Sequence, residues 1–240
     1  MTVWIPYCGP GSTPLDALER WNFDPIVLLC LAGMTVLACS RLRGSSRVSG
    51  LASVAVLTLS FVSPLCALSS ALFAARTVHH VLLFAVAAPL IAFALPRRHV
   101  GSLALATLIQ SVAFWVWHAP GMYEAALSST AIYWVMQVSV LGTATWFWIA
   151  VRHSGVASAV IALLAAMVAM GLLGALLTFS PEALYAPHLS TTQAWGLTPL
   201  EDQQTAGLIM WAPAAAVYLA AALLVLGRWI GPDRAGPHAA

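Results

Sequence analysis

The chain has 240 residues, of which 61% are hydrophobic and only 8% charged, and its formal charge at pH 7 is +2. Soluble domains carry about 25% charged residues, so this composition excludes an ordinary soluble protein and leaves no basic surface stripe for nucleic acid. The apolar stretches are continuous and close to the ~20 residues that cross a bilayer as a helix, whereas barrel strands would alternate. We therefore expect an all-α, polytopic membrane helix bundle, formed by residues 1–240 as a single transmembrane domain in a lipid bilayer.

Seven apolar segments predict seven transmembrane helices, at about residues 24–40, 48–68, 71–95, 100–118, 131–151, 156–179 and 206–229. Pro64 should bend or end the second of them, because proline interrupts the backbone hydrogen bonds of a helix. Gly171 and Gly174 in the sixth are small enough to allow close contact with a neighbouring helix.

The charged residues predict the orientation. Of the ten arginines, eight fall in alternate connections or in the C-terminal tail, at positions 41, 43, 47, 97, 98, 152, 228 and 234. Arg20 and Arg76 fall on the opposite side together with seven of the eight acidic residues. Because the arginine-rich side of a membrane protein is usually cytoplasmic, we expect the N-terminus and the connection at 180–204 to be external. The C-terminus should be cytoplasmic.

The four cysteines form no Cys-x-x-Cys pair. Cys30, Cys39 and Cys66 lie in apolar stretches, where cysteine packs as a small hydrophobic residue. Cys8 lies in the polar N-terminal segment. We expect neither a disulfide framework nor a cysteine-rich metal site.

Polar residues at membrane depth gather toward the predicted external side: His79 and His80, His118, Tyr133 and Gln137, and Asp202. Polar groups at this depth usually face the bundle interior or a cavity. His80, His118 and Asp202 come from three predicted helices and are candidates for one shared site. The structural alternatives are histidines solvated at helix ends, favoured for His79 and His188, and an acid stabilised at a helix N-terminus for Asp202.

Several motifs in this order resemble the CtaG-type cytochrome c oxidase assembly factors of bacteria, which are seven-helix membrane proteins. The motifs are Trp21-Asn22-Phe23-Asp24-Pro25, Ser63-Pro64-Leu65, His80-Val81-Leu82-Leu83, Trp117-His118-Ala119-Pro120 and Asp202-Gln203-Gln204 with the segment to Trp211. The resemblance implies an assembly factor, not an enzyme, in the bacterial inner membrane, with heme-copper oxidase catalytic subunits as partners. It also implies copper delivery on the periplasmic side through His80, His118 and Asp202. Met122 and Met210 lie near the external histidines in the sequence and are candidate soft ligands for Cu(I).

The chain departs from the family pattern at three positions. Arg76 stands where the family has a histidine four residues before His80, and Tyr133 and Gln137 stand where it often has a histidine pair. Arginine keeps its proton and cannot bind a metal, so Arg76 is instead predicted to pair with Asp202 or Glu201.

Two alternative functions remain open, the first favoured by these departures and the second by the similar depth of His80 and His118. One is a metal-free subunit or scaffold bound to a respiratory oxidase. The other is a heme-binding membrane protein, in which His80 and His118 would be the axial ligands.

Overall fold

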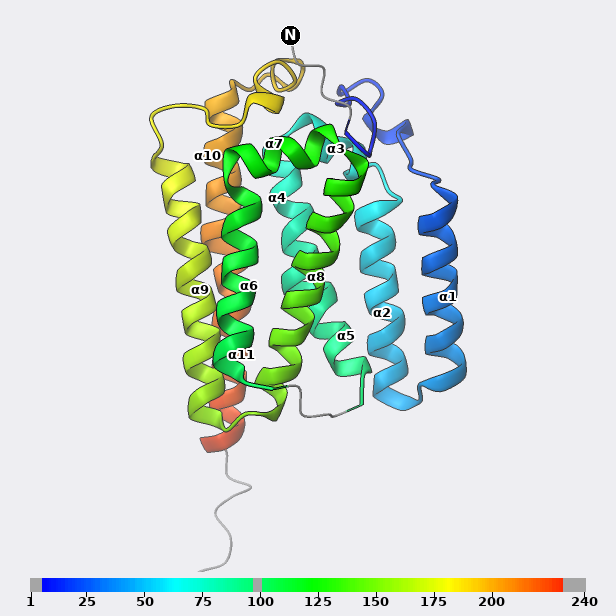
Figure 1. Cartoon of the computed structure of the whole chain (residues 1–240), viewed down its shortest axis with the longest axis vertical. Helices are drawn as coiled ribbons and strands as arrows, with labels where there is room; N and C mark the ends of the chain where they lie inside the picture. Colours follow the sequence, from blue (N-terminus) through cyan, green and yellow to red (C-terminus); the bar gives the residue numbers. More distant parts are fainter. Residues whose placement is uncertain (1–5, 97–100, 231–240) are drawn as a thin grey trace, which may run out of the picture.

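The computed structural model describes residues 6–96 and 101–230, and within these ranges it contains helices and turns but no strands. The long helices run side by side along one axis and form an elongated bundle (Figure 1). Their bounds are α1 Pro25–Arg41, α2 Gly44–Phe61, α3 Leu65–Ala71, α4 Phe73–Val81, η2 Leu82–Ala87, α5 Ala88–Ala94, α6 Leu103–His118, α7 Pro120–Ser128, α8 Thr130–His153, α9 Val156–Phe179, α10 Pro199–Ile209, η5 Met210–Ala214 and α11 Ala215–Ile230. Three short 3-10 turns lie outside the bundle, η1 Ala17–Glu19, η3 Ala186–His188 and η4 Gln193–Trp195.

Four helical segments of the described chain are long and apolar enough to cross a membrane: Phe73–Ala94, Thr130–His153, Val156–Phe179 and Pro199–Ile230. Two bent pairs raise this number to six, α2 with α3 at 44° and α6 with α7 at 73°. The remaining candidate, α1, has 17 residues and is about 25 Å long at 1.5 Å per residue. Up to six of the seven predicted spans are thus supported, and α1 as a seventh stays a prediction.

Proline shapes the helices at three places. Pro64 follows the end of α2 and precedes α3, as predicted. Pro89 lies in the first turn of α5, just after the π-helical segment η2, and Pro213 lies inside the π-helical segment η5. Because proline has no N–H, it leaves a carbonyl of the preceding turn without its usual donor. The indole of Trp148 donates a hydrogen bond to the Phe84 carbonyl at 3.0 Å, which ties η2 to α8.

Two glycines allow a close contact between α9 and α10. A Cβ atom added to Gly207 would lie 2.6 Å from the Gly174 carbonyl oxygen, and one added to Gly174 would lie 2.8 Å from the Gly207 oxygen. Neither position has room for a side chain. The predicted role of Gly174 in close packing is confirmed, and its partner is the glycine of α10.

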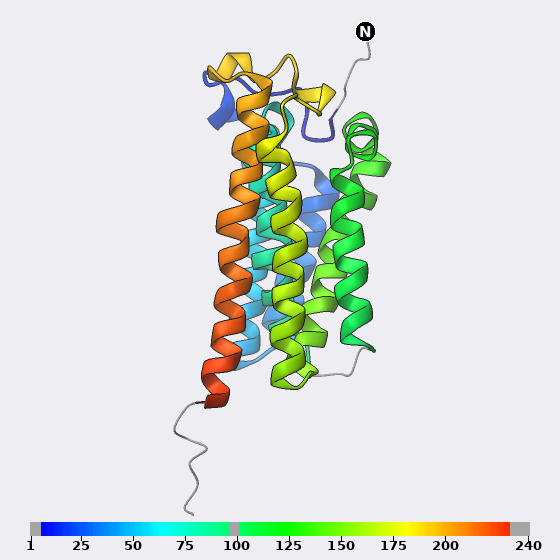
Figure 2. The same cartoon turned by 90° about the vertical axis from the view of Figure 1, so that its left-hand side faces the viewer.

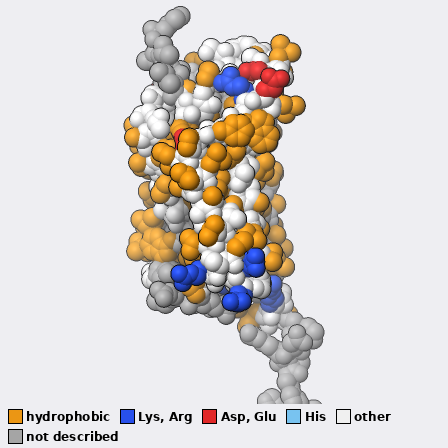
Figure 3. Space-filling model, turned by 90° about the vertical axis from the view of Figure 1, so that its right-hand side faces the viewer, with side chains coloured by type: hydrophobic (Ala, Val, Ile, Leu, Met, Phe, Trp, Pro, Cys, Tyr) orange, Lys and Arg blue, Asp and Glu red, His pale blue; other side chains and the backbone are white. Residues whose placement is uncertain are grey.

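Charged side chains lie at the two ends of the bundle (Figure 3). We call the end that carries Arg41, Arg43, Arg47, Arg152 and Arg228 the arginine-rich end. Arg97, Arg98 and Arg234 belong to the same predicted side but lie outside the described residues. The opposite end is covered by the N-terminal segment and by the segment between α9 and α10 (Figure 2).

A disulfide joins Cys8 to Cys66, with the two Cα atoms 5.4 Å apart. Cys66 is buried, as expected, but the expectation that the cysteines form no disulfide was wrong. The N-terminal segment folds back over the end of the bundle and brings Cys8 to α3, a contact between residues 58 positions apart. Cys30 and Cys39 are free, but they are exposed on α1 rather than packed inside.

Candidate functional site

Two of the three predicted metal ligands lie next to each other inside the bundle. His80 comes from α4 and His118 from the last turn of α6. Their rings are nearly perpendicular, with centroids 5.4 Å apart, and both side chains are buried, with 1% and 3% of their surface exposed. The fold therefore brings together two imidazoles from helices that are separate in the sequence.

The hydrogen bond of the His118 ring fixes its tautomer. Its Nδ1 lies 2.7 Å from the carbonyl oxygen of Phe114, one turn earlier in α6. A carbonyl only accepts, so Nδ1 carries the proton and Nε2 presents a lone pair. This Nε2 and both ring nitrogens of His80 are buried without a hydrogen-bond partner among the described residues. A histidine that donates through one nitrogen and leaves the other open is the usual arrangement of a metal ligand.

Asp202, the third predicted ligand, has a different contact. Its Oδ2 accepts a hydrogen bond from the Phe73 amide at 2.7 Å, and its Oδ1 accepts one from the Ala74 amide at 3.1 Å. It therefore caps the N-terminus of α4 from the first turn of α10. Within the described residues, no group of three His, Cys, Asp or Glu side chains is placed to hold a metal ion. A ligand role for Asp202 stays a prediction.

Arg76 is fully buried on α4, one turn before His80. Its Nε donates to the Ser69 carbonyl at 3.2 Å, and its guanidinium lies 5.4 Å from the ring centroid of Tyr133. The predicted ion pair with Asp202 or Glu201 was wrong, because the only salt bridge among the described residues joins Arg20 to Asp16.

Both predicted partners of Arg76 are engaged elsewhere. The oxygens of Asp202 accept from the amides of α4, and the carboxylate of Glu201 closes a capping box with Thr198. The two terminal nitrogens of Arg76 have no hydrogen-bond partner in the described part of the chain.

Arg76, His79, His80, His118, Tyr133 and Gln137 form what we call the polar cluster. All six are buried, with at most 3% of their surface exposed. His79 packs edge-on against Phe61, with ring centroids 5.0 Å apart, so the expectation of a solvated helix-end histidine was wrong. Both ring nitrogens of His79 and both amide atoms of Gln137 lack partners among the described residues.

His188 was also expected to be solvated, and it is buried as well. It packs in the segment between α9 and α10. Its Nδ1 lies 3.2 Å from the Ala71 carbonyl, and its Nε2 accepts from the Tyr123 hydroxyl at 2.6 Å. Burial lowers the pKa of His188 to about 3. The sequence around His188 showed no sign of this contact, because its partners lie 65 and 117 residues away.

Tyr185 links the same segment directly to the candidate ligands. Its hydroxyl donates to the His118 carbonyl at 2.7 Å, and its ring stacks on Phe73, with centroids 3.9 Å apart. The segment between α9 and α10 therefore holds the ends of α4 and α6 together above the two imidazoles.

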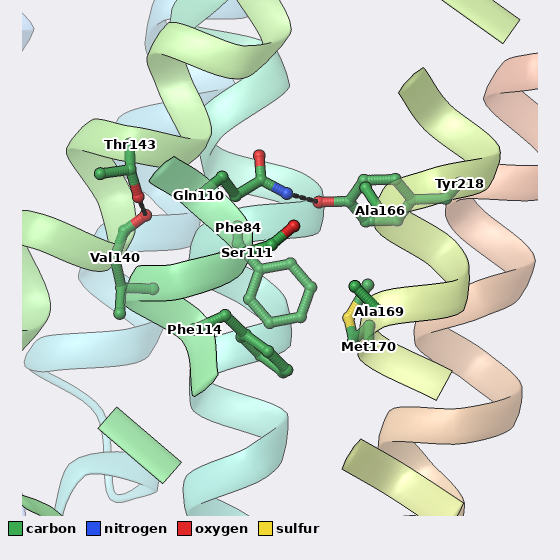
Figure 4. A pocket seen from close by; sticks show the side chains of 10 residues that line it. All are labelled: Phe84, Gln110, Ser111, Phe114, Val140, Thr143, Ala166, Ala169, Met170 and Tyr218. Atoms are coloured by element: carbon green, nitrogen blue, oxygen red, sulfur yellow. Dashed lines mark hydrogen bonds between the residues drawn. The ribbon is translucent and has the colours of Figure 1, made fainter. Parts of the chain in front are cut away.

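A small cavity of about 20 Å³ lies beside α6, and Figure 4 shows the side chains that line it. Gln110 and Phe114 line it, and they lie two turns and one turn before His118 on the same face of α6. The Gln110 amide donates to the Tyr218 hydroxyl at 3.1 Å. This volume is sufficient for one water molecule and too small for a substrate or a heme.

Comparison with known proteins identifies one protein family. The model of a family described as cytochrome c oxidase caa3 assembly factor matches residues 98–231, more than half of the chain. The matched part contains His118, Tyr133, Gln137 and Asp202, whereas Arg76 and His80 precede it. No curated protein and no solved structure matches the chain.

Proposed function

We propose that this chain, which belongs to the cytochrome c oxidase caa3 assembly factor family, assists copper insertion into a heme-copper oxidase. The proposal rests on the pair of buried imidazoles of His80 and His118, and above all on the open Nε2 of His118. Imidazole nitrogen suits copper. Copper is the cargo in this reading, and the partner is the catalytic subunit that receives it.

A pair of imidazoles is better suited to transferring copper than to storing it. Two imidazoles leave coordination positions open, as in metal sites that exchange ligands during their reaction. The positive charge of Arg76 lies one helical turn from His80 and opposes a bound cation, because like charges repel strongly away from water. Both features weaken binding and favour release to a client that supplies further ligands.

We place the site at the external, periplasmic side of a bacterial inner membrane, with the C-terminus in the cytoplasm. The arginine-rich end supports this orientation. The Cys8–Cys66 disulfide at the opposite end supports it too, since disulfides persist in oxidising compartments.

Cysteine labelling in intact cells tests the orientation. Glu182→Cys and Arg43→Cys would be made in a background lacking Cys30 and Cys39, because those two cysteines are free. We expect an impermeant reagent to label position 182 and not position 43. Strong labelling of position 43 would reverse the orientation.

Alanine substitution tests the copper role. His80→Ala and His118→Ala should each lower oxidase activity and the copper bound per protein while leaving the protein level near normal. His153→Ala is the matched control, because His153 also bonds a carbonyl one turn earlier, Ile149 at 2.8 Å, but lies at the arginine-rich end. If both variants behave like His153→Ala, the copper proposal is wrong.

A metal-free scaffold for the oxidase is the second candidate. It is favoured by the buried charge of Arg76, and by the lack of a three-ligand group among the described residues. Metal analysis of the protein co-purified with oxidase subunits after mild extraction separates the two candidates. A visible-region absorption spectrum of the same sample would reveal heme, the remaining alternative.

A further inference from the structure

A groove of about 470 Å³ lies between α1, α2 and α8, in the half of the bundle away from the arginine-rich end. Figure 1 shows α1 at the rim of the bundle, where it packs on α2. The side chains at the edges of the groove are exposed: Ile26 of α1 is 72% exposed and Val138 of α8 is 66% exposed. The groove therefore opens sideways, where a helix bundle in a membrane meets lipid.

The wall made by α8 is one helical face that contains a single amide side chain. Its lining residues are Thr130, Trp134, Gln137, Val138 and Leu141. Steps of three and four residues place them on the same side of the helix. Gln137 lies two turns into α8 and is only 1% exposed. A polar side chain thus lies at the back of a groove whose walls are mainly apolar.

The amide of Gln137 has hydrogen-bonding capacity that the described residues do not use. Neither its oxygen nor its nitrogen makes a hydrogen bond with a described residue. The hydroxyl of Tyr133, one turn earlier on α8, is a polar neighbour. One hydroxyl can satisfy only one of the positions that an amide offers, which are two N–H donors and two lone pairs. Because an unpaired amide away from water is unfavourable, the remaining positions favour a ligand that enters through the groove.

Three aromatic rings surround the same groove. Trp134 stacks on Phe61, with ring centroids 5.4 Å apart, and meets Tyr7 edge-on at 5.1 Å. All three side chains line the groove. Planar rings stack on aromatic side chains in an offset arrangement. The groove therefore combines aromatic faces for a flat ring with an amide for a polar substituent on that ring.

We propose that this groove is a binding site for a membrane-soluble quinone. The quinone ring would lie against Trp134, and one of its carbonyls would accept a hydrogen bond from the Gln137 amide. The apolar tail would lie along Leu31 and Met34 of α1, which line the groove farther from the start of that helix. The proposal concerns binding alone and does not depend on copper delivery. The groove and the polar cluster share Gln137.

Isothermal titration calorimetry of the full-length, copper-free protein in detergent tests this site. The probes are decylubiquinone and decylbenzene, which share the ten-carbon tail, whereas only the quinone ring carries carbonyls. We expect the protein to bind the quinone more tightly. Gln137→Leu keeps most of the side-chain volume and removes the amide. It should bind the quinone roughly tenfold more weakly, the effect of one lost buried hydrogen bond, and bind decylbenzene as the wild type does.

A matched pair of variants tests the place of binding without changing the amide. Val138→Trp fills the groove from an exposed position of α8 and should abolish binding of the quinone. Val135→Trp puts the same side chain on the same helix one turn earlier, at a position that is 59% exposed and does not line the groove. It should bind the quinone as the wild type does. Thermal unfolding shows whether each variant is folded.

Three results would overturn the proposal. One is equal affinity of the wild type for the two probes, since the groove would then hold any apolar molecule of the bilayer. Another is wild-type affinity of folded Gln137→Leu for the quinone. The third is equal quinone binding by Val138→Trp and Val135→Trp. Neither copper content nor oxidase activity enters these measurements, so failure of the copper proposal would leave the result unchanged.

Discussion

The carboxylate of Asp202 accepts a hydrogen bond from the Phe73 amide at 2.7 Å, across 129 positions of sequence. This contact places an acidic side chain of α10 at the positive end of α4, where helix amides lack internal partners. Because α4 carries both Arg76 and His80, the same contact sets the position of the polar cluster.

Asp202→Ala should destabilise the protein by about 2–4 kcal/mol, because it removes a helix cap and leaves two buried amides unpaired. Asp202→Asn should destabilise the protein less, because the asparagine side-chain oxygen can still accept a hydrogen bond from one of the two amides. Thermal unfolding in detergent measures both, with the exposed Glu182→Ala as control. Loss of copper in Asp202→Asn at unchanged thermal stability would instead make Asp202 a metal ligand.

Arg76→His should raise the amount of copper bound per protein. The change removes a buried positive charge and gives α4 two imidazoles at i and i+4, which lie on one helix face. Arg76→Gln is the matched control, because it removes the charge without adding a ligand. Equal copper binding by the two variants would assign the effect to charge alone, and no gain in either would contradict the site.

Gly207→Ala should destabilise the bundle by about 1–3 kcal/mol, the usual cost of overpacking, because its Cβ would lie 2.6 Å from the Gly174 oxygen. Gly142→Ala in α8 is the control: no atom lies within 4 Å of the added Cβ, so it should be neutral or stabilise by up to about 1 kcal/mol. The melting temperature should therefore fall in Gly207→Ala and stay the same or rise in Gly142→Ala. Equal shifts would mean that α9 and α10 are not in close contact.

Acid should loosen the segment that holds His188. Burial lowers the pKa of His188 from 6.5 to about 3, so the folded ring stays neutral while the unfolded chain takes up a proton below pH 6.5. The free energy of unfolding should then fall by roughly 1.4 kcal/mol for each pH unit between about 6.5 and 3.

His188→Gln isolates this contribution, since glutamine does not titrate. The difference in stability between wild type and variant should shrink as the pH falls from 7 to 5, in denaturant titrations at each pH. A difference that stays constant over this range would show that His188 is not buried in the folded protein.

Long apolar helices were the most predictable part of the fold. The predicted segment 156–179 coincides with α9, Val156–Phe179. Inside a bilayer a single segment satisfies its backbone hydrogen bonds by forming a helix, so a long unbroken apolar stretch predicts a helix of the same extent. The 73° turn from α6 into α7 was not predicted. The turn depends on Pro120 starting a new helix over a short segment, and apolar periodicity does not encode the direction of that helix.

The candidate site was predictable only in part. His80 and His118 were found because polar residues at membrane depth tend to face inward. The cap made by Asp202 and the burial of His188 were missed, because each depends on a contact with a segment more than 60 residues away. The charge of Arg76 predicted a carboxylate partner, but helix amides compete for Asp202 and engage both of its oxygens.

The Cys8–Cys66 bond also has a consequence for biogenesis. Between the two cysteines lie α1 and α2, so the disulfide closes a loop that contains both helices. If α1 and α2 form a transmembrane hairpin, as predicted, we expect the two cysteines to be oxidised only after that hairpin has been inserted. Pulse labelling followed by a non-reducing gel would measure when Cys8 and Cys66 become oxidised. Chains in which the bond has not formed would keep two free thiols at these positions, which an alkylating reagent would trap.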